Sequence, residues 1–117
     1  MSRRPKPPPP PDLSAASAAA WPGLTSDLEV ATGASAVDLA LLADLLRACD
    51  RLAQLRELLE RDGLTVTGSQ GQVRPHPVLA VESALRREVA QGWDRLGLSS
   101  RHRGFVEVLP SGRLRRG

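Results

Sequence analysis

The chain has 117 residues, of which 41% are hydrophobic and only 3% aromatic, and its net charge is +3. This length and composition predict one folded domain whose modest core of Leu, Val and Ala suits helix-on-helix packing. A single cysteine excludes an intrachain disulfide framework. No charge-free apolar run reaches the length of a membrane span. Five consecutive prolines follow the first basic residues, where a signal peptide would need an apolar segment. We therefore expect a soluble protein of a reducing cytoplasm.

The first part of the chain combines a proline-rich segment with short helical patterns. Residues 1–11 are basic and rich in proline, which predicts an extended, disordered arm. Strong helix formers follow over residues 13–21, behind a possible cap at Asp12. Pro22 is expected to kink or end that helix, and a helical turn or two resumes over residues 25–31.

A long amphipathic helix is predicted over residues 38–62, with Ser35 as a plausible N-cap and Asp38 favourable near its positive end. Its apolar residues recur in alternating steps of four and three: Leu41, Leu45, Ala48, Leu52, Leu55 and Leu59. A neighbouring stripe uses Leu42, Leu45, Leu46, Cys49 and Leu58. The two stripes together are wider than the face needed to pack one partner helix.

A short β-hairpin and a second helix follow. Residues 64–67 and 72–74 flank a turn bounded by glycines, which is typical of a hairpin. Pro77 can be the first helical residue, because its missing N–H would have no partner there. The helix predicted over residues 77–96 repeats the three-and-four pattern with Val78, Val81, Leu85, Val89, Trp93 and Leu96.

The expected fold is mainly α, an antiparallel helical hairpin with a short β-hairpin link. One face of the long helix then remains apolar, which predicts self-association into a homo-oligomer. We expect the seam between copies to use five leucines: Leu41, Leu45, Leu52, Leu55 and Leu59.

Positive charge lies at both ends of the sequence, around a slightly acidic middle. Residues 1–12 have a net charge of +2, and residues 101–117 have five arginines against Glu107. Such ends fit contact with nucleic acid, although basic termini are also ordinary solubility devices. The alternation in residues 105–109 resembles a strand, and the residues after it read as a second arm or a loose tail.

No catalytic or metal-binding pattern is present in the sequence. The only lysine, Lys6, lies beside the prolines and not in a phosphate-binding loop. His76, His102 and Cys49 are not at ligand spacing. His102 lies among arginines, which do not orient it as the base of a triad. We expect no enzyme, no metal and no cofactor.

The order of these signals resembles the bacteriophage terminase small-subunit family over residues 12–103. The runs that resemble its motifs are Trp21 and Leu28 before Asp38-Leu39-Ala40-Leu41-Leu42, then Gly63-Leu64-Thr65-Val66, His76-Pro77, and Leu96-Gly97-Leu98-Ser99 with Arg101 and Arg103 after it. Two departures stand out. Ser100 occupies the place of the family's usual proline, and Pro22 follows the tryptophan where many relatives continue a helix.

The resemblance implies a DNA-recognition factor of viral packaging that forms a ring and works with a large subunit carrying the ATPase and nuclease, in the cytoplasm of the bacterial host. We expect a helical family domain over residues 12–103, and a basic strand or tail over residues 104–117 that docks on the large subunit. Viral double-stranded DNA would be held by Arg3, Arg4, Lys6, Arg101, Arg103, Arg113, Arg115 and Arg116.

Two alternatives remain open at the level of the sequence. One is a non-viral helical interaction module whose apolar face binds a foreign helix. The other is a DNA-binding regulator that works as a dimer.

Overall fold

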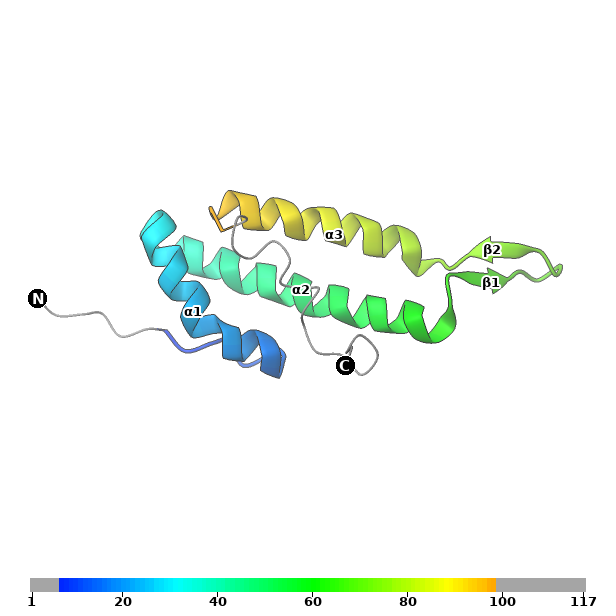
Figure 1. The fold of residues 1–117 in the computed structure, drawn as a ribbon, viewed down its shortest axis with the longest axis horizontal. Coiled ribbons are helices and arrows are strands. Elements are labelled where there is room, and N and C mark those ends of the chain that lie inside the picture. The colour runs from blue at the N-terminus through cyan, green and yellow to red at the C-terminus, as the bar shows by residue number, and fades with distance from the viewer. Residues whose placement is uncertain (1–6, 99–117) are drawn as a thin grey trace, which may run out of the picture.

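The computed structural model describes residues 7–98, which form three helices and a two-stranded antiparallel sheet. In chain order the elements are α1 (Ala15–Thr32), α2 (Ala36–Asp62), β1 (Thr65–Thr67), β2 (Val73–Pro75) and α3 (Val78–Arg95). Figure 1 shows α2 and α3 side by side, the β-hairpin projecting from one end of this pair, and α1 folded back across the first part of α2. The expected helical hairpin with a β-hairpin link is confirmed. Within residues 7–98, no helix is long and apolar enough to cross a membrane.

Helix α1 continues through Pro22, so of the two outcomes expected at this residue, a kink or an end, the end is wrong. Its N-cap is Ser14 and not Asp12: the Ser14 side chain accepts a hydrogen bond from the backbone N–H of Ser17. A proline inside a helix removes one backbone hydrogen bond and is unfavourable. Here Trp21 and Leu28 are almost completely buried, and we attribute the survival of the helix to this packing.

Helix α2 begins as the sequence predicted. The Ser35 hydroxyl accepts from the backbone N–H of Asp38 at 3.1 Å, and the Asp38 carboxylate accepts from the backbone N–H of Ser35 at 3.2 Å. This reciprocal pair is a capping box. The helix ends at Asp62, where Gly63 has a φ of +84° that most other residues would adopt only with strain.

The core lies where α2 is enclosed by the other two helices. On one side Leu45 packs against Gly92 of α3, where a larger residue would collide with the leucine side chain. On another side Asp50 bonds to Ser17 of α1. The buried apolar residues of this core include Trp21, Leu24, Leu28, Leu42, Leu46, Cys49, Leu52, Leu85, Val89 and Trp93. Much of the wide apolar surface of α2 is therefore covered within one chain, by α1 as well as α3.

The expected seam between copies stays a prediction, but its five leucines differ in how far one chain already buries them. Leu45, Leu52 and Leu59 are buried within the subunit, with exposed fractions of 6%, 1% and 6%. Leu45 and Leu52 belong to the core cluster shared by the three helices, and Leu59 is buried outside that cluster. Leu41 and Leu55 are only partly buried, so they are the members of the predicted set that still present a surface.

Replacing Leu52 by Asp should unfold the subunit and not merely separate copies. The change places an unpaired carboxylate in the core and should lower the free energy of unfolding by about 4 kcal/mol or more. Circular dichroism during thermal unfolding measures the effect. Val37→Asp, at an exposed site near the start of α2, should change stability by no more than about 0.5 kcal/mol. A Leu52→Asp variant as helical and heat-stable as the parent would show that this packing is misassigned.

Candidate nucleic-acid interface

Charge is divided sharply between the folded body and the chain ends. Residues 7–98 carry eight arginines and twelve carboxylates, a net charge of −4. Residues 1–6 and 99–117 carry eight basic residues against Glu107, a net charge of +7. The phosphates of a nucleic acid are attracted by Lys and Arg and repelled by carboxylates. The net charge of the body thus opposes contact with nucleic acid, whereas the net charge of the end segments favours it.

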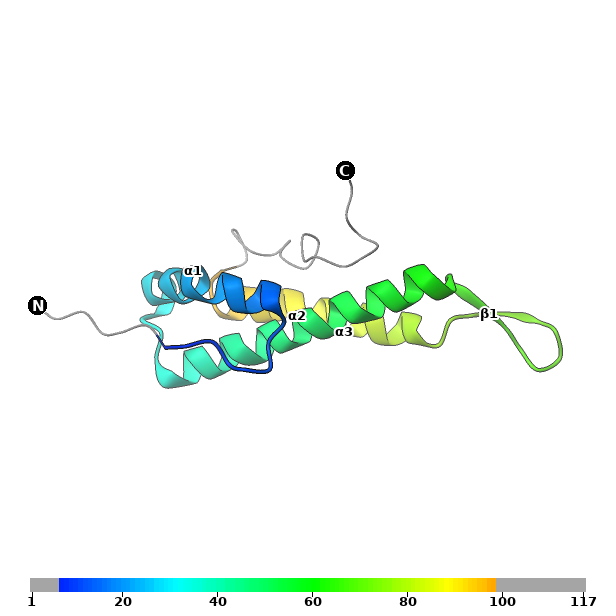
Figure 2. The ribbon, with the colours of Figure 1, turned by 90° about the horizontal axis from the view of Figure 1, so that it is seen from below.

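The eight predicted DNA-binding residues all fall in those ends, outside the described residues; they are Arg3, Arg4, Lys6, Arg101, Arg103, Arg113, Arg115 and Arg116. The structure instead shows at which end of the described body the two segments that carry these residues are joined to it. In both Figure 1 and Figure 2 the described chain begins, in dark blue, and ends, in orange after α3, at the same end of the rod. The β-hairpin lies at the opposite end. We call the first of these the terminal end of the body.

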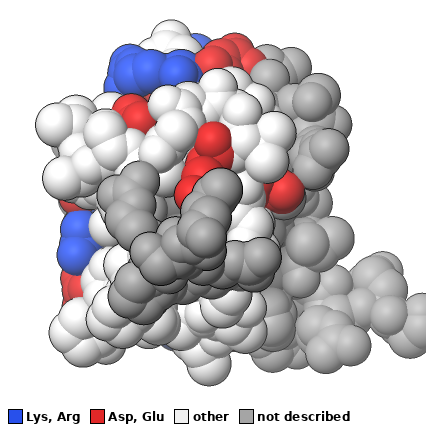
Figure 3. Space-filling model, turned by 90° about the vertical axis from the view of Figure 1, so that its left-hand side faces the viewer, with Lys and Arg blue, Asp and Glu red and all other residues white. Residues whose placement is uncertain are grey.

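The described surface at the terminal end is not itself basic. Figure 3 views this end and shows mostly uncharged residues with scattered carboxylates and few arginines, part of it covered by residues that the structure does not describe. Positive charge at this end must therefore come from the attached segments.

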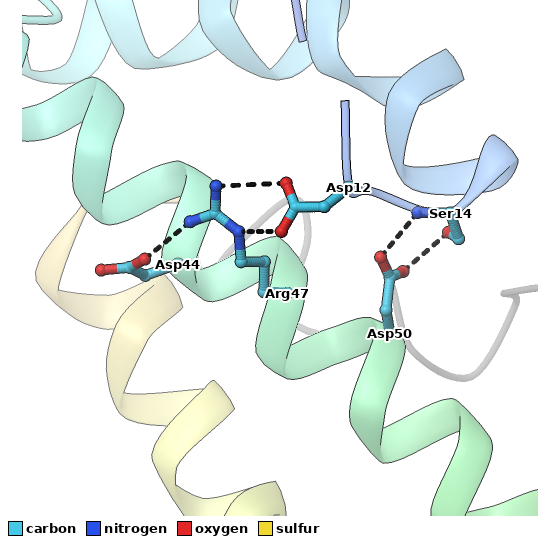
Figure 4. Close-up of polar contacts among 5 residues, drawn as sticks. All are labelled: Asp12, Ser14, Asp44, Arg47 and Asp50. Carbon is cyan, nitrogen blue, oxygen red and sulfur yellow. Dashed lines mark hydrogen bonds and ion pairs between the residues drawn. The ribbon is translucent and has the colours of Figure 1, made fainter. Parts of the chain in front are cut away.

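A set of polar contacts holds the segment before α1 against the body (Figure 4). Arg47 of α2 donates from Nε to Asp12 Oδ2 at 2.6 Å and from Nη2 to Asp12 Oδ1 at 3.2 Å. Its Nη1 donates to Asp44 Oδ1 at 2.9 Å. The hydrogen bond from Arg47 lowers the pKa of the Asp12 carboxyl. The contact between Arg47 and Asp12 thus joins two residues that lie 35 positions apart in the sequence.

Two further contacts extend this attachment. Asp50 accepts from the backbone N–H of Ser14 at 2.8 Å and from its hydroxyl at 2.7 Å. The indole N–H of Trp21 donates to the carbonyl oxygen of Pro7 at 2.8 Å. The expectation of a disordered arm over residues 1–11 stays a prediction, and within it the structure describes residues 7–11, with Pro7 hydrogen-bonded to Trp21. Residues 1–6 of that arm lie outside the described part of the chain.

An ion-pair network sets the register of α2 against α3. The buried carboxylate of Glu82 accepts from Arg86 at 2.6 Å and from Arg56 of α2 at 3.2 Å. Burial raises the pKa of Glu82, but the hydrogen bonds from Arg86 and Arg56 outweigh it, so the pKa lies below its ordinary value. The carboxylate is therefore ionised and paired at neutral pH.

His76 joins the hairpin to both long helices. Its backbone N–H donates to Leu64 at 2.8 Å, its Nδ1 accepts from the backbone N–H of Val78 at 3.1 Å, and its Nε2 lies 3.2 Å from Asp62. The neutral ring thus carries its hydrogen on Nε2 and donates it to Asp62. This supports the interpretation of His76 as part of the helix start.

The remaining reactive side chains offer no catalytic arrangement in the part of the chain that the structure describes. Cys49 is fully buried, and burial raises the pKa of its thiol to about 12, so the nucleophilic thiolate is scarce at neutral pH. Among residues 7–98, no group of three or more His, Cys, Asp or Glu side chains is placed to hold a metal ion.

Replacing Glu82 by Gln should destabilise the helical pair at neutral pH by about 2 kcal/mol, because it leaves two arginines without their carboxylate. Denaturant titrations at pH 7 and pH 3 measure this. A lowered pKa means that the contribution of Glu82 is fully present above its unfolded value and is lost as the pH falls through its folded value. The gap between parent and variant should therefore shrink at pH 3. A gap independent of pH, or none at pH 7, would contradict this role.

Comparison with known proteins gives one match. The sequence model of a family described as phage terminase, small subunit, matches residues 17–112. The match includes most of α1, all of α2, the hairpin and α3, and it begins after Asp12 and Ser14. No curated protein and no solved structure matches the chain.

Proposed function

The chain belongs to the phage terminase small-subunit family, which has a role in packaging phage DNA, and on that premise we propose that it binds viral double-stranded DNA through its basic ends. We further propose that it recruits and regulates the large terminase subunit, which supplies the ATPase and nuclease, in the cytoplasm of the bacterial host. Members of the family are generally non-catalytic, so the chain would act by binding.

The separation of charge carries the DNA-binding proposal. The body, with a net charge of −4, repels phosphates, while the end segments, with a net charge of +7, attract them. Both ends are attached at the terminal end of the body. In a ring of identical subunits these segments would repeat around the axis and form a basic rim or tunnel for duplex DNA.

We also propose that the chain assembles into that ring. The candidate contact surface is the apolar surface that remains exposed on the subunit. Leu41 and Leu55 remain partly exposed on α2, and Leu58 lies beside Leu55 in a surface hollow. A second hollow of about 210 Å³ lies between α2 and α3, with Leu41 and Leu96 among its lining residues. We place the seam between copies on this remaining apolar surface. Docking on the large subunit we assign to residues 104–117.

The DNA proposal is tested by neutralising Arg113, Arg115 and Arg116 to Gln in one variant. Fluorescence anisotropy with duplex DNA over a salt series should show weaker binding and a shallower salt dependence, by about 0.9 in log–log slope for each phosphate that is no longer neutralised. The matched control changes three exposed body arginines, Arg51, Arg74 and Arg87, and removes the same charge. Equal losses of affinity in the two variants, or no loss in the first, would place the DNA-binding surface elsewhere.

The seam is tested by Leu55→Asp. Because Leu55 is only partly buried, the variant should stay helical but lose self-association. Light scattering after size exclusion gives the mass, and circular dichroism gives the helix content. Ala40→Asp, at an exposed site near the start of α2, is the control and should keep the parent mass. A parent protein that is a monomer at micromolar concentration would end the ring proposal.

A further inference from the structure

The β-hairpin projects from the body instead of packing on it. Figures 1 and 2 both show it extending past the ends of α2 and α3. Leu64 and Val73 are 61% and 72% exposed, although both side chains are large and apolar. A hairpin of two strands is only marginally stable in water and is normally completed by a further strand or a helix. The exposed hairpin therefore indicates a surface that another element covers.

Hydrogen bonds inside the hairpin alternate along its strands. The backbone N–H of Gly68 donates to the carbonyl oxygen of Gln72 at 2.6 Å, and that of His76 donates to the carbonyl oxygen of Leu64 at 2.8 Å. In an antiparallel pair, residues that exchange such bonds alternate with residues whose N–H and C=O groups point outwards. The strand residues at alternate positions between these bonds therefore offer their backbone groups to a further strand.

These outward groups make β1 an open edge and β2 a closed one. On β1 they belong to Thr65 and Thr67, which are both exposed. On β2 they belong to the register partners of these threonines, Pro75 and Val73. Pro75 has no backbone N–H and cannot donate to a neighbouring strand, and proline is a common means of closing the edge of a sheet. A further strand can therefore pair in full only with β1.

Charge favours a second copy of the same chain as the source of that strand. Between Asp62 and Glu82 the only Lys, Arg, Asp or Glu residue is Arg74, which lies on β2. The body as a whole has a net charge of −4, so two bodies repel each other. At β1 neither copy brings a charge. Two copies therefore meet with the least repulsion along this strand.

Strand β1 is also complementary to itself. When two copies lie antiparallel around Val66, Thr65 of each copy is opposite Thr67 of the other, and the outward groups of both threonines are paired. Val66 then faces Val66 of the second copy, and the threonines also face one another, in cross-strand pairs that favour a sheet. The two hairpins, of two strands each, form one sheet in the order β2–β1–β1–β2. Both outer edges of that sheet are closed by Pro75, so the pairing ends with two copies.

We propose that β1 is a docking edge for β1 of a second copy, and that it joins two rings of this chain hairpin to hairpin. The inference rests on the proposed ring. One contact between strands of three residues is small, and it becomes strong only where a ring repeats it and many contacts form together. A subunit that cannot form the ring, such as the Leu55→Asp variant, would therefore stay a monomer. Because the hairpin lies opposite the terminal end of the body, the terminal ends of both rings point away from the contact.

The two edges provide a matched pair of proline variants. Thr67→Pro and Val73→Pro each remove an outward N–H from one member of the same register pair, and neither removes a hydrogen bond inside the hairpin. Thr67→Pro blocks the open edge and should halve the mass of the assembly, measured by light scattering after size exclusion. Val73→Pro changes only the closed edge and should keep the parent mass. Circular dichroism should show both variants to be as helical as the parent.

A cysteine at the centre of β1 traps the contact without any proline. In the proposed pairing the Cα atoms of the two Val66 residues are about 4.5 Å apart, as in a non-hydrogen-bonded pair, and this distance suits a disulfide. With oxidised glutathione, Val66→Cys should therefore give a covalent dimer on a non-reducing gel. Val73→Cys, at an exposed site on β2, is the control and should run as a single chain. Cys49 is buried and should react in neither variant.

The outcomes separate this inference from the proposed ring. A halved mass in Thr67→Pro alone, together with a covalent dimer in Val66→Cys alone, supports it. A Thr67→Pro assembly with the parent mass, an equal fall in mass in both proline variants, or a ring without a covalent dimer in Val66→Cys would overturn it and leave the ring proposal standing. A monomeric parent protein would overturn the ring and this inference together.

Discussion

The long helix α2 carries apolar residues on two sides, and the need to cover both sides shapes the rest of the structure. Helix α3 covers one side, with Gly92 giving Leu45 room to approach, and Glu82 fixes the register of the pair through Arg56. Helix α1 covers the other side and stays helical through Pro22 while doing so. Apolar burial is the main favourable term in such a small body, so the enclosure of α2 is what makes the subunit stable.

The same enclosure gives the rod two unlike ends. Because α2 and α3 are antiparallel and linked by the hairpin, the hairpin lies at one end. Since α1 folds back along α2 and the described residues before α1 run beside it, the described chain begins and ends at the other end of the rod. The two segments that carry the basic residues predicted to bind DNA are thereby joined to the same end of an acidic body. A short protein with a net charge of only +3 can in this way concentrate positive charge at one place.

The elements themselves were predictable because their signals are local. Ser35 and Asp38 form the expected capping box, residues 65–75 form the expected hairpin, and Trp93 continues the buried stripe. The possible end of the helix at Pro22 was predicted wrongly, because helix propensity alone does not include the burial of Trp21 and Leu28.

The contacts between the helices, and between α2 and the residues before α1, could not be predicted, since they join residues that are far apart in the sequence. Nothing local links Asp12 with Arg47, or Arg56 with Glu82, and each pair meets only after the helices have packed. The leucine seam between copies stays a prediction, and three of its five leucines lie buried within one chain. A repeat on one helix shows that a surface is apolar, but it does not show whether α1 or another copy of the chain covers that surface.

We propose that DNA is engaged at the end where the described residues 7–98 begin and end, and not along the acidic body. Hydrogen–deuterium exchange of the full-length protein, with and without duplex DNA, tests this directly. We expect new protection in residues 1–12 and 96–117, with the hairpin and the middle of α2 unchanged. Protection confined to the hairpin or to the exposed face of α2, with the two chain ends unaffected, would contradict the claim.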